Sequence, residues 1–356
     1  MSESPPKSTK SRGFILVTGG AGYIGATVCS ALEDAGWTPI ILDNLSQGRR
    51  EFTAGRIFYE GDASDRRLLK KVAAERGHLY AAIHCAALIV VPESVERPED
   101  YYRENVAKSV ELFAGLRDVG CNRIVFSSSA AIYDTVPDFM VTENSPLNPS
   151  SPYSRSKYMM EMILQDFCDA YAIQGMSLRY FNPIGADPKL RTGAYIDSPT
   201  HVLGRMLSVA SGQSPVFEIT GTNWPTRDGS GIRDYIHVWD LARAHVKAIE
   251  NFERAFTAKP TKTSQAAASS KNYRVINLGT GRGVTVRELV ASFEAVTGKT
   301  LNKKESPPRL GDVAGSFASH HTASELIDWR AERTIDDAIR DALAWTKHWQ
   351  TVASKH

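Results

Sequence analysis

The chain has 356 residues, of which 42% are hydrophobic, and this is enough to bury the core of one large domain and a smaller lobe. Its formal net charge of +2 at pH 7 gives no strong field, so we expect no nucleic acid partner and no membrane partner. No run of about 18 apolar residues is present, so the sequence predicts no membrane span.

The N-terminus and the cysteines bear on the compartment. Residues 1–12 are polar and contain prolines, without the apolar stretch of a secretory signal, so we expect a flexible tail. The cysteines are scattered, with no CxxC pair, at Cys29, Cys85, Cys121 and Cys168. This spacing favours small buried residues in a reducing compartment, the cytoplasm, over a disulfide framework or a metal site.

Short apolar runs typical of buried parallel strands recur in the first half of the chain, at residues 14–19, 39–44, 81–87, 123–129 and 177–182. Stretches with helical periodicity separate most of them. Strands that alternate with helices predict an α/β fold, a Rossmann-like doubly wound parallel sheet with helices on both faces.

The pattern changes after residue 182, where loop-rich segments come first and strand and helix signals resume later. We expect residues 13–182 to form mainly the sheet domain. Residues 183–356 should form mainly a smaller C-terminal lobe that binds substrate, with segments that return to the sheet. Residues 255–272 are low in large apolar side chains and predict an exposed insertion.

A glycine-rich turn follows the first predicted strand and opens a helix. Gly19, Gly22 and Gly25 permit a tight turn whose backbone N–H groups can approach a pyrophosphate at the helix N-terminus. A glycine triplet alone is weak evidence, but an acidic residue, Asp43, stands about twenty positions on, at the end of the second predicted strand. This context predicts a dinucleotide-binding domain.

Asp43 also predicts which dinucleotide is bound. A carboxylate there accepts hydrogen bonds from ribose hydroxyls and repels a 2′-phosphate, so we expect NAD as the cofactor; Arg49 and Arg50 nearby are the one feature that favours NADP. Asp62, in the run EGDAS, is placed where an adenine amino group could be met.

The run SPYSRSK, residues 151–157, predicts a helix start, with a serine cap and Pro152 in the first turn. Tyr153 and Lys157 are four residues apart, so they lie on one face of that helix.

The glycine spacing, the serines of FSSSAAIY and the Tyr-x-x-x-Lys spacing together resemble the extended short-chain dehydrogenase/reductase superfamily. The resemblance implies that Tyr153 is the acid/base, that Lys157 lowers the Tyr153 pKa and binds the nicotinamide ribose, and that Ser129 bonds the reacting sugar hydroxyl. A phenol titrates near pH ~10 when unperturbed, so a base acting at neutral pH needs positive charge nearby.

The resemblance narrows to the UDP-glucose (UDP-galactose) 4-epimerases. It extends from residue 13 to about residue 350, apart from the insertion, and its most specific motifs are LRYFNPIGA and RDYIHVWDLARAH. It implies NAD-dependent C4 epimerisation of a UDP-hexose through a transient 4-keto sugar, a homodimer, and no metal. UDP-glucose and UDP-galactose are the expected substrates, with UDP-GlcNAc and UDP-GalNAc also open.

Related activities remain as alternatives. Nucleotide-sugar dehydratases carry an acidic pair after the active-site Ser or Thr, whereas Ala130 and Ala131 follow Ser129 here. A UDP-pentose (xylose/arabinose) 4-epimerase would use the same catalytic residues. A non-catalytic NAD-binding sensor is a further alternative, against which the intact Tyr153 and Lys157 argue.

The resemblance also implies two sets of contacts. The expected cofactor contacts are Gly19, Gly22, Tyr23, Ile24, Gly25, Asp43, Asn44, Asp62, Ala63, Cys85, Ala86, Ala87, Asn105, Lys157 and Phe181. The expected substrate contacts are Ser129, Tyr153, Asn182, His201, Val216, Phe217, Glu218, Arg233, Arg309, Asp312 and Ser316. The two arginines suit the diphosphate, because a guanidinium fork pairs with phosphate oxygens.

Three positions depart from the family pattern. Ile89 stands where many epimerases carry a lysine, and His201 follows Thr200 where others carry a pair of asparagines. Ser316 aligns with a residue that bounds the sugar pocket, where a tyrosine excludes 2-acetamido sugars and a small residue admits them. His237, in RDYIHV, is expected to be structural.

Overall fold

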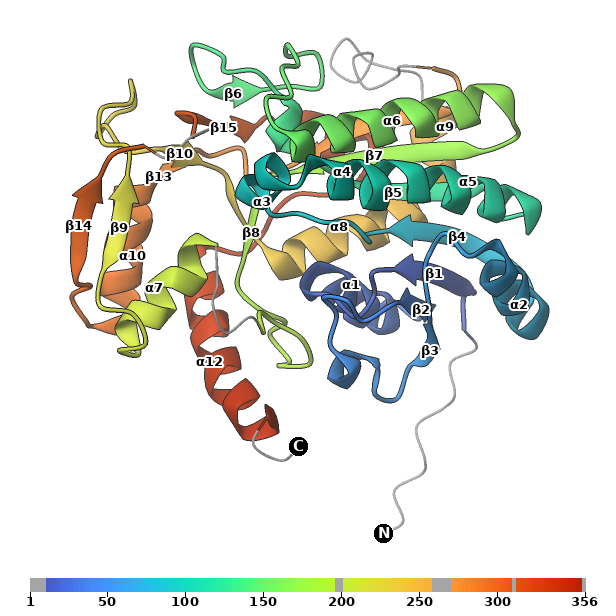
Figure 1. The fold of residues 1–356 in the computed structure, drawn as a ribbon, viewed down its shortest axis with the longest axis horizontal. Helices are drawn as coiled ribbons and strands as arrows, with labels where there is room; N and C mark the ends of the chain where they lie inside the picture. Colours follow the sequence, from blue (N-terminus) through green and yellow to red (C-terminus); the bar gives the residue numbers. More distant parts are fainter. Residues whose placement is uncertain (1–10, 196–200, 258–269, 309–311, 354–356) are drawn as a thin grey trace.

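The computed structural model describes residues 11–195, 201–257, 270–308 and 312–353. Its core is a seven-stranded parallel sheet with the strand order β12-β7-β5-β4-β1-β2-β3 (Figure 1). The order reverses between β1 and β4, and this is the switch point at which doubly wound sheets bind their ligands. The predicted Rossmann-like α/β fold is confirmed.

The strands of this sheet lie close to the predicted apolar runs. Their bounds are β1 (Phe14–Thr18), β2 (Thr38–Asp43), β3 (Ile57–Glu60), β4 (Leu79–His84), β5 (Arg123–Ser129), β7 (Gln174–Tyr180) and β12 (Tyr273–Leu278). The largest difference is in β4, which ends at His84, so that the apolar residues 85–87 lie in the loop that follows the strand.

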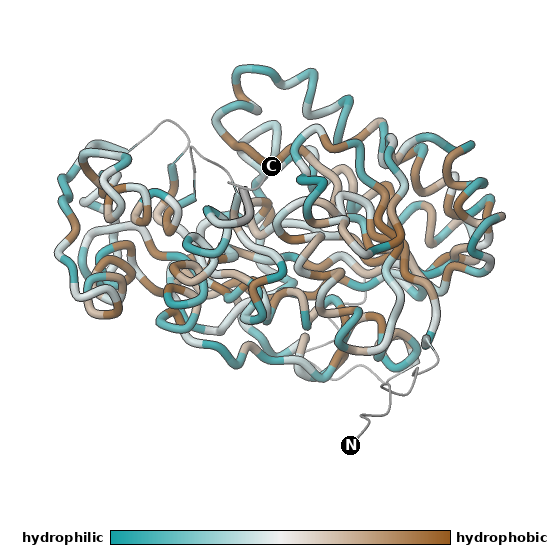
Figure 2. Tube along the Cα trace, turned by 90° about the horizontal axis from the view of Figure 1, so that it is seen from below, coloured by the Kyte–Doolittle hydropathy of each residue, from teal (hydrophilic) through white to brown (hydrophobic). Residues whose placement is uncertain are grey.

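Successive side chains of each strand point to opposite faces, and each face has its own helical layer. Ile15 and Val17 pack on one face with α1 (Tyr23–Asp34), α8 (Val238–Glu250), α9 (Phe252–Thr257) and α11 (His321–Ile327). Leu16 packs on the other face with α2 (Arg66–Arg76), α5 (Lys108–Asp118) and α6 (Pro152–Ala170). Figure 2 shows hydrophobic chain concentrated along the stacked strands and hydrophilic chain in many outer loops.

Short helical segments connect these elements. They are the 3₁₀ turns η1 (Arg50–Thr53) and η3 (Ala130–Ile132), the helices α3 (Val91–Glu96) and α4 (Pro98–Tyr101), and the π-helix η2 (Tyr102–Ala107) that leads into α5. Residues 102–118 therefore form one continuous helical stretch, which begins as a π-helix and ends at Asp118.

The smaller lobe has a core of its own, built on α7, α10 and α12. Its elements are β9 (Phe217–Thr220), β14 (Lys303–Ser306), α7 (Val202–Ala210), α10 (Val286–Thr297) and α12 (Ile335–Ala353). The remaining strands form two small sheets. One has the order β13 (Val284–Thr285), β10 (Ile232–Arg233), β15 (Gly315–Ala318) and β6 (Met140–Val141), and the other pairs β11 (Tyr235–His237) with β8 (Asn182–Ile184).

Two predicted boundaries need correction. The exposed insertion does not begin at residue 255, because α9 runs to Thr257 and buries Phe252 and Ala255 against the sheet; residues 258–269 lie outside the described residues. Arg12 does not belong to a flexible tail, because it pairs with Glu250 and its backbone N–H donates to Gly36 O at 3.0 Å; residues 1–10 lie outside the described residues.

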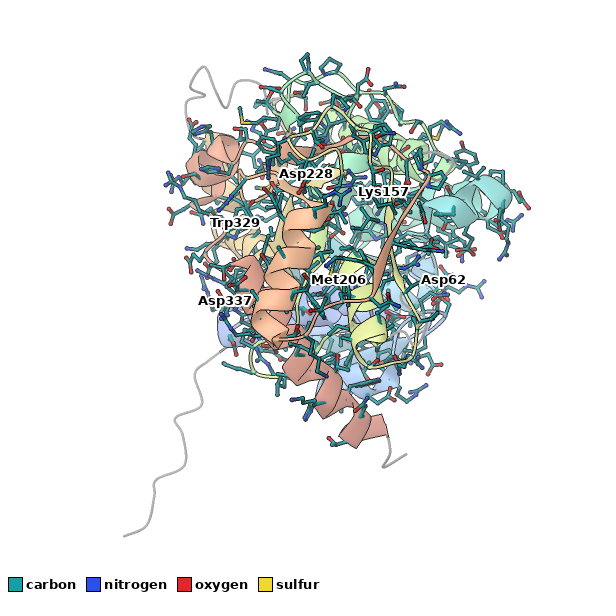
Figure 3. All side chains as sticks on the ribbon, turned by 90° about the vertical axis from the view of Figure 1, so that its left-hand side faces the viewer. Asp62, Lys157, Met206, Asp228, Trp329 and Asp337 are labelled. Carbon is teal, nitrogen blue, oxygen red and sulfur yellow. The ribbon has the colours of Figure 1, made fainter. Side chains whose placement is uncertain are left out.

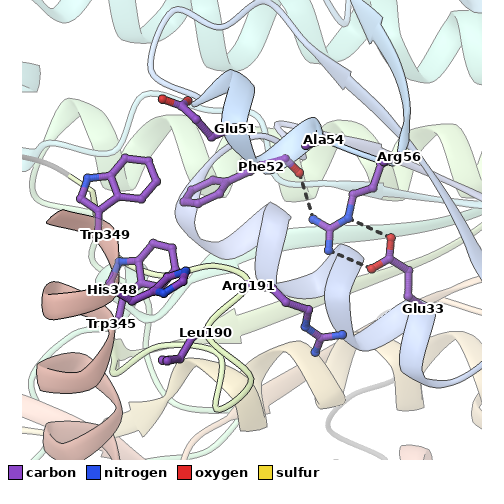
Figure 4. A pocket seen from close by; sticks show the side chains of 11 residues that line it. Glu33, Glu51, Phe52, Ala54, Arg56, Leu190, Arg191, Trp345, His348 and Trp349 are labelled. Carbon is purple, nitrogen blue, oxygen red and sulfur yellow. Dashed lines mark hydrogen bonds and ion pairs between the residues drawn. The ribbon is translucent and has the colours of Figure 1, made fainter. Parts of the chain in front are cut away.

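No helix in the described part of the chain is long and apolar enough to cross a membrane. A surface cavity of about 390 Å³ lies between η1 and the end of α12, lined partly by Phe52, Trp345 and Trp349 (Figure 4). None of its lining residues belongs to the predicted cofactor or substrate contacts, so this cavity is separate from the site described next.

Candidate active site

The glycine turn after β1 forms a cradle made of backbone. A Cβ atom on Gly25 would lie 2.2 Å from the carbonyl oxygen of Gly19, and one on Gly19 would lie 2.7 Å from the Ala86 nitrogen. Gly19 also has φ +70°, a left-handed conformation that favours glycine. The turn therefore packs closely against α1 and against the loop after β4.

The start of α1 is free to bind an anion. Its N-cap is Gly22, so no side chain caps the first N–H groups of the helix, which begins with Tyr23 and Ile24. The Tyr23 hydroxyl donates to Gly185 O at 2.6 Å and so ties the helix to the smaller lobe. Glycines in close backbone contact and an uncapped helix N-terminus fit the pyrophosphate of a dinucleotide.

Asp43 ends β2 beside this cradle. Its Oδ2 accepts from the Ala21 N–H at 3.0 Å and its Oδ1 from the Leu45 N–H at 2.8 Å, so the carboxylate is held in one orientation. Burial raises the Asp43 pKa, and these two hydrogen bonds oppose that effect. Each oxygen keeps a lone pair for a ribose hydroxyl.

The two arginines near Asp43 have partners of their own. The Arg49 guanidinium lies 5.2 Å from the centroid of the Tyr195 ring, and Arg50 forms an ion pair with Glu60. Both arginines therefore have contacts within the protein, and their presence no longer favours NADP over NAD.

Asp62 and Ala63 follow β3. Asp62 accepts from Lys108 Nζ at 2.6 Å and from the Ser64 N–H at 2.9 Å. Burial opposes ionisation of Asp62, but the hydrogen bonds from Lys108 and Ser64 outweigh it and lower the pKa. The contact of this carboxylate with an adenine remains a prediction, as does that of Asn44, whose Oδ1 accepts from the Ser46 N–H.

The loop after β4 faces the glycine turn with Cys85, Ala86 and Ala87. Asn105 holds the next residue of this loop, because its Oδ1 accepts from the Leu88 N–H at 2.8 Å and its Nδ2 donates to Leu88 O at 3.0 Å. Asn105 is fully buried, so we expect it to shape the loop as well as to meet the cofactor. Ile89 is 61% exposed.

Helix α6 begins as predicted. Ser151 is its N-cap and forms a capping box with Ser154, and Pro152 occupies the first turn, where its missing N–H costs nothing. This start fixes the positions of Tyr153 and Lys157, one turn apart on the buried face of the helix.

Lys157, labelled in Figure 3, is buried, with an exposed fraction of 2%. Its Nζ donates to Ser127 O at 3.0 Å and lies 5.0 Å from the centroid of the Phe126 ring. Burial lowers the Lys157 pKa to about 8, and Cys85 and Glu161 oppose this shift. Among the described residues, two of its three N–H donors have no hydrogen-bond partner, and these can serve ribose hydroxyls.

Tyr153 and Ser129 meet at the end of β5. Both side chains are nearly buried, and they lie close together. Burial raises the Tyr153 pKa, and the Ser129 hydroxyl beside it opposes this shift. The ring of Tyr101 packs edge-on against Tyr153 at a centroid distance of 6.5 Å. The structure thus brings the three predicted catalytic residues, from β5 and α6, to the carboxyl end of the sheet.

Phe181 and Asn182 follow β7 at the same edge. Phe181 packs against Ala130, Tyr133 and Val141, and Asn182 begins β8 with an exposed side chain. Both therefore lie beside the turn that follows Ser129, which is consistent with the predicted contacts to nicotinamide and sugar.

Arg233 and Ser316 are register partners in the parallel pair β10 and β15. The Arg233 guanidinium does not pair with Asp234 or Asp240 among the described residues; it donates to Ile232 O and Ala314 O, both at 2.8 Å. Arg233 therefore stabilises the strand that carries Ser316.

The remaining predicted substrate contacts are spread over the smaller lobe. His201 is the N-cap of α7, where its Nδ1 accepts from the Gly204 N–H at 3.1 Å, and burial lowers its pKa. Val216 precedes β9, Phe217 is buried in the lobe core, and Glu218 pairs with Lys304. Any contact of Phe217 with a base is therefore through its backbone.

Several predicted residues have other outcomes. Arg309 and Thr200 lie outside the described residues, and Asp312 follows the undescribed segment. His237 is structural, as expected: its Nδ1 accepts from the Trp239 N–H at 3.0 Å, and its Nε2 lies 3.1 Å from an oxygen of Asp341.

Sequence reasoning missed a buried ion pair behind the catalytic residues. Glu161 lies one turn after Lys157 on α6, and it pairs with Arg179 of β7 through Nη2–Oε2 at 2.6 Å. Both side chains are almost fully buried. The signal was present, since Arg179 belongs to the motif LRYFN and Glu161 follows SPYSRSK, but each could equally have been a surface charge.

A glycine cradle at the switch point of a doubly wound sheet, with Ser, Tyr and Lys beside it, defines a dinucleotide-dependent enzyme of the Rossmann class. Residues 15–260 match the model of the NAD dependent epimerase/dehydratase family. The chain is 39% identical over 350 residues to a UDP-glucose 4-epimerase of Yersinia pestis, covering 95% of this chain and 97% of the relative.

Solved structures give the same result. A UDP-glucose 4-epimerase from Brucella ovis in complex with NAD superimposes with a TM-score of 0.85 at 36% identity, covering 94% of this chain and 98% of that one. One from Stenotrophomonas maltophila, with bound NAD and formylated UDP-arabinopyranose, superimposes with a TM-score of 0.87 at 32% identity, covering 96% and 100%. This chain belongs to the NAD dependent epimerase/dehydratase family.

Proposed function

We propose that this protein is an NAD-dependent 4-epimerase of UDP-hexoses that interconverts UDP-glucose and UDP-galactose. The observation that carries the proposal is the arrangement of Ser129, Tyr153 and Lys157 at the end of the sheet that holds the glycine cradle, with Tyr153 next to Ser129 and Lys157 anchored on Ser127 O. The relatives described above are named UDP-glucose 4-epimerases, and their alignments cover almost the whole length of this chain.

Each residue of the trio has a distinct task. Bound NAD supplies reversible hydride transfer at the sugar C4 atom. Tyr153 takes the proton from the C4 hydroxyl, and Ser129 holds the same oxygen by a hydrogen bond. Lys157 lies one helical turn after Tyr153 on the same buried face of α6, and we propose that its charge favours the ionised form of Tyr153 during the reaction. After the 4-keto sugar has turned, Tyr153 returns the proton to the other epimer.

The glycine cradle and Asp43 hold the cofactor. We propose that Gly19, Gly22 and Gly25 admit the pyrophosphate and that Asp43 accepts hydrogen bonds from the adenosine ribose hydroxyls. Sheet residues before position 182 therefore form most of the NAD site. The lobe after position 182 grips the UDP group.

Arg233 is proposed to bind the diphosphate together with Arg309. Such a reaction needs a firm grip on UDP and a loose grip on the sugar, because only the sugar turns. The carbonyl groups that Arg233 now contacts leave further guanidinium N–H groups for phosphate oxygens. His201 and Asn182 complete the proposed substrate contacts.

Ser316 extends the proposal to 2-acetamido sugars. Its side chain is small and half-buried, and β15 lies beside the strand of Arg233, so the sugar lies next to it when the diphosphate is held. A serine leaves room where a tyrosine would fill the pocket. We therefore propose that UDP-GlcNAc and UDP-GalNAc are also accepted.

The protein is further proposed to be a cytoplasmic homodimer. All four cysteines are unpaired in the structure, as befits a reducing compartment. Helices α5 and α6 pack side by side, and Met162 on α6 is 42% exposed, so this pair of helices offers apolar surface to a second copy.

The test is an epimerase assay on the purified protein without added NAD. UDP-galactose should be converted to UDP-glucose, and UDP-GalNAc and UDP-arabinose provide parallel arms. Tyr153→Phe should lower kcat by about 10²- to 10⁴-fold while the protein still carries NAD. Absence of turnover in every arm, with NAD bound, would indicate the sensor alternative, and normal turnover by Tyr153→Phe would remove the acid/base assignment.

A further inference from the structure

A buried hydrogen-bond chain runs behind the catalytic residues, from α6 to the turn that carries Ser129. It begins at Glu161, whose carboxylate accepts from Arg179 Nε at 2.9 Å and Nη2 at 2.6 Å, and from the hydroxyl of Ser128. The pair is bidentate and almost fully buried, so the guanidinium plane has a fixed orientation.

The remaining end of the guanidinium reaches Tyr133. Arg179 Nη1 donates to the Tyr133 hydroxyl at 2.9 Å, and the guanidinium lies 5.0 Å from the centroid of the Tyr133 ring. The Tyr133 hydroxyl in turn donates to Asn277 Oδ1 at 2.7 Å. The phenol is thus fixed on two sides, by β7 and by β12.

Tyr133 follows directly on the turn η3, which Ser129 caps. The Ser129 Oγ accepts from the Ala131 N–H at 3.2 Å, and the Tyr133 N–H donates to Ala130 O at 3.1 Å. Only the three residues 130–132 separate Ser129 from Tyr133, whose phenol is anchored. A displacement of Tyr133 therefore displaces the Ser129 side chain.

We propose that Tyr133 is a positioning residue that, through Arg179 and Glu161, fixes Ser129 relative to the helix that carries Tyr153 and Lys157. This rests on the proposed epimerase function and deepens it. One chain of contacts connects the strand end that holds the substrate hydroxyl to the helix that removes its proton. It also gives a physical role to Arg179 and Asn277, which are not among the predicted substrate or cofactor contacts.

The chain depends on the phenol hydroxyl. Without it, Arg179 Nη1 and Asn277 Oδ1 lose a buried partner, and Asn277 Nδ2 already has none in this structure. Arg179 and Asn277 would then form new hydrogen bonds with water or with the backbone of η3, and η3 would move. A shift of about 1 Å in a catalytic group can lower turnover by about 10²-fold.

The test compares Tyr133→Phe with Tyr273→Phe. Tyr273 is a fully buried tyrosine on β12 whose hydroxyl donates to Ser177 Oγ at 2.6 Å, so its loss removes one buried hydrogen bond from the same strand pair without touching Ser129. Tyr133→Phe should lower kcat for UDP-galactose about tenfold or more, with KM within about twofold and unchanged NAD content. Tyr273→Phe should keep kcat within about twofold of the wild type.

Crystal structures of the two variants give a readout that does not depend on turnover. The hydrogen bond from the Ala131 N–H to Ser129 Oγ should be lost, and Ser129 displaced, in Tyr133→Phe, whereas both should be unchanged in Tyr273→Phe. Equal kcat values for the two variants, or an unmoved Ser129 in Tyr133→Phe, would overturn the proposal. An inactive wild type with Ser129 displaced only in Tyr133→Phe would instead count against the epimerase function and support the positioning role.

Discussion

The ammonium of Lys157 lies 3.0 Å from the backbone carbonyl of Ser127, two residues before Ser129 on the same strand. The carboxyl end of β5 therefore holds two residues of the site. The backbone carbonyl of Ser127 anchors Lys157, and Ser129 contributes its hydroxyl next to Tyr153. One strand and one helix are enough to assemble the catalytic group, provided that their relative position is fixed.

Turnover should fall at alkaline pH. Burial lowers the Lys157 pKa to about 8, so the ammonium loses its proton as the pH rises through that value. The charge that favours ionised Tyr153 is then lost, and kcat should decline on the alkaline side. The measurement is kcat from about pH 6 to about pH 10. A profile without an alkaline limb would show that Lys157 does not act through its charge.

Lys157→Met should be inactive and yet more stable than the wild type near neutral pH. The Lys157 pKa falls from 10.5 to about 8 on burial, a cost on the order of 3 kcal/mol. Below about pH 8 this cost is present in full, because both folded and unfolded lysine are charged. Between about pH 8 and 10.5 the unfolded state binds more protons, so wild-type stability rises with pH relative to Lys157→Met.

Urea unfolding of NAD-free protein at several pH values checks this prediction. The stability difference between Lys157→Met and the wild type should shrink from about pH 8 toward pH 10.5. A difference that is constant with pH would mean that Lys157 ionises normally in the folded protein.

Gly25→Ala should abolish cofactor retention. The new methyl carbon would lie 2.2 Å from the Gly19 carbonyl oxygen, so α1 must move away from the glycine turn. Gly115→Ala is the matched control, because Gly115 is also helical and its methyl would meet side-chain atoms and no backbone, with Leu69 Cδ1 at 2.5 Å and Arg66 Cγ at 3.4 Å. Released NAD is quantified after denaturation of each purified variant. Comparable NAD content in the two variants would show that the glycine cradle does not hold the cofactor.

Ser316→Tyr should suppress epimerisation of UDP-GalNAc selectively. The bulky ring would occupy the space that Ser316 leaves beside the strand of Arg233, while UDP-galactose lacks the acetamido group. kcat/KM for both substrates is measured, with Ser316→Ala as a small-residue control that should keep both activities. An equal loss on both substrates would remove the specificity role of Ser316.

The shared face of Tyr153 and Lys157 was predictable from their spacing, whereas the roles proposed for them and for Ser129 came from the resemblance to the short-chain dehydrogenase/reductase superfamily. Tyr153 and Lys157 share a helical face whatever the surroundings, and the capping serine and Pro152 mark where that helix begins. The glycine turn was predictable for a similar reason, since close backbone approach excludes any side chain.

The residues that position this trio were not predictable in the same way. Glu161, Arg179 and Tyr133 come from three separate elements, and a charged residue in a sequence is more often solvated than buried. Only the register of β5 with β7, which places Ser128 opposite Arg179, brings them together. The α9 boundary was missed because Ala255 carries no signal of burial until the sheet lies beneath it.

The sheet recruits strands from both halves of the chain, and this limits how the protein can be divided. Strand β12, residues 273–278, completes the edge next to β7, and α8 covers the face on which α1 lies. A fragment that stops at residue 182 would expose the β7 edge and the apolar floor beneath α8 to solvent. The two halves therefore bind different ligands but depend on each other to fold. Two polypeptides split at this point would have to associate before either could reach its native structure.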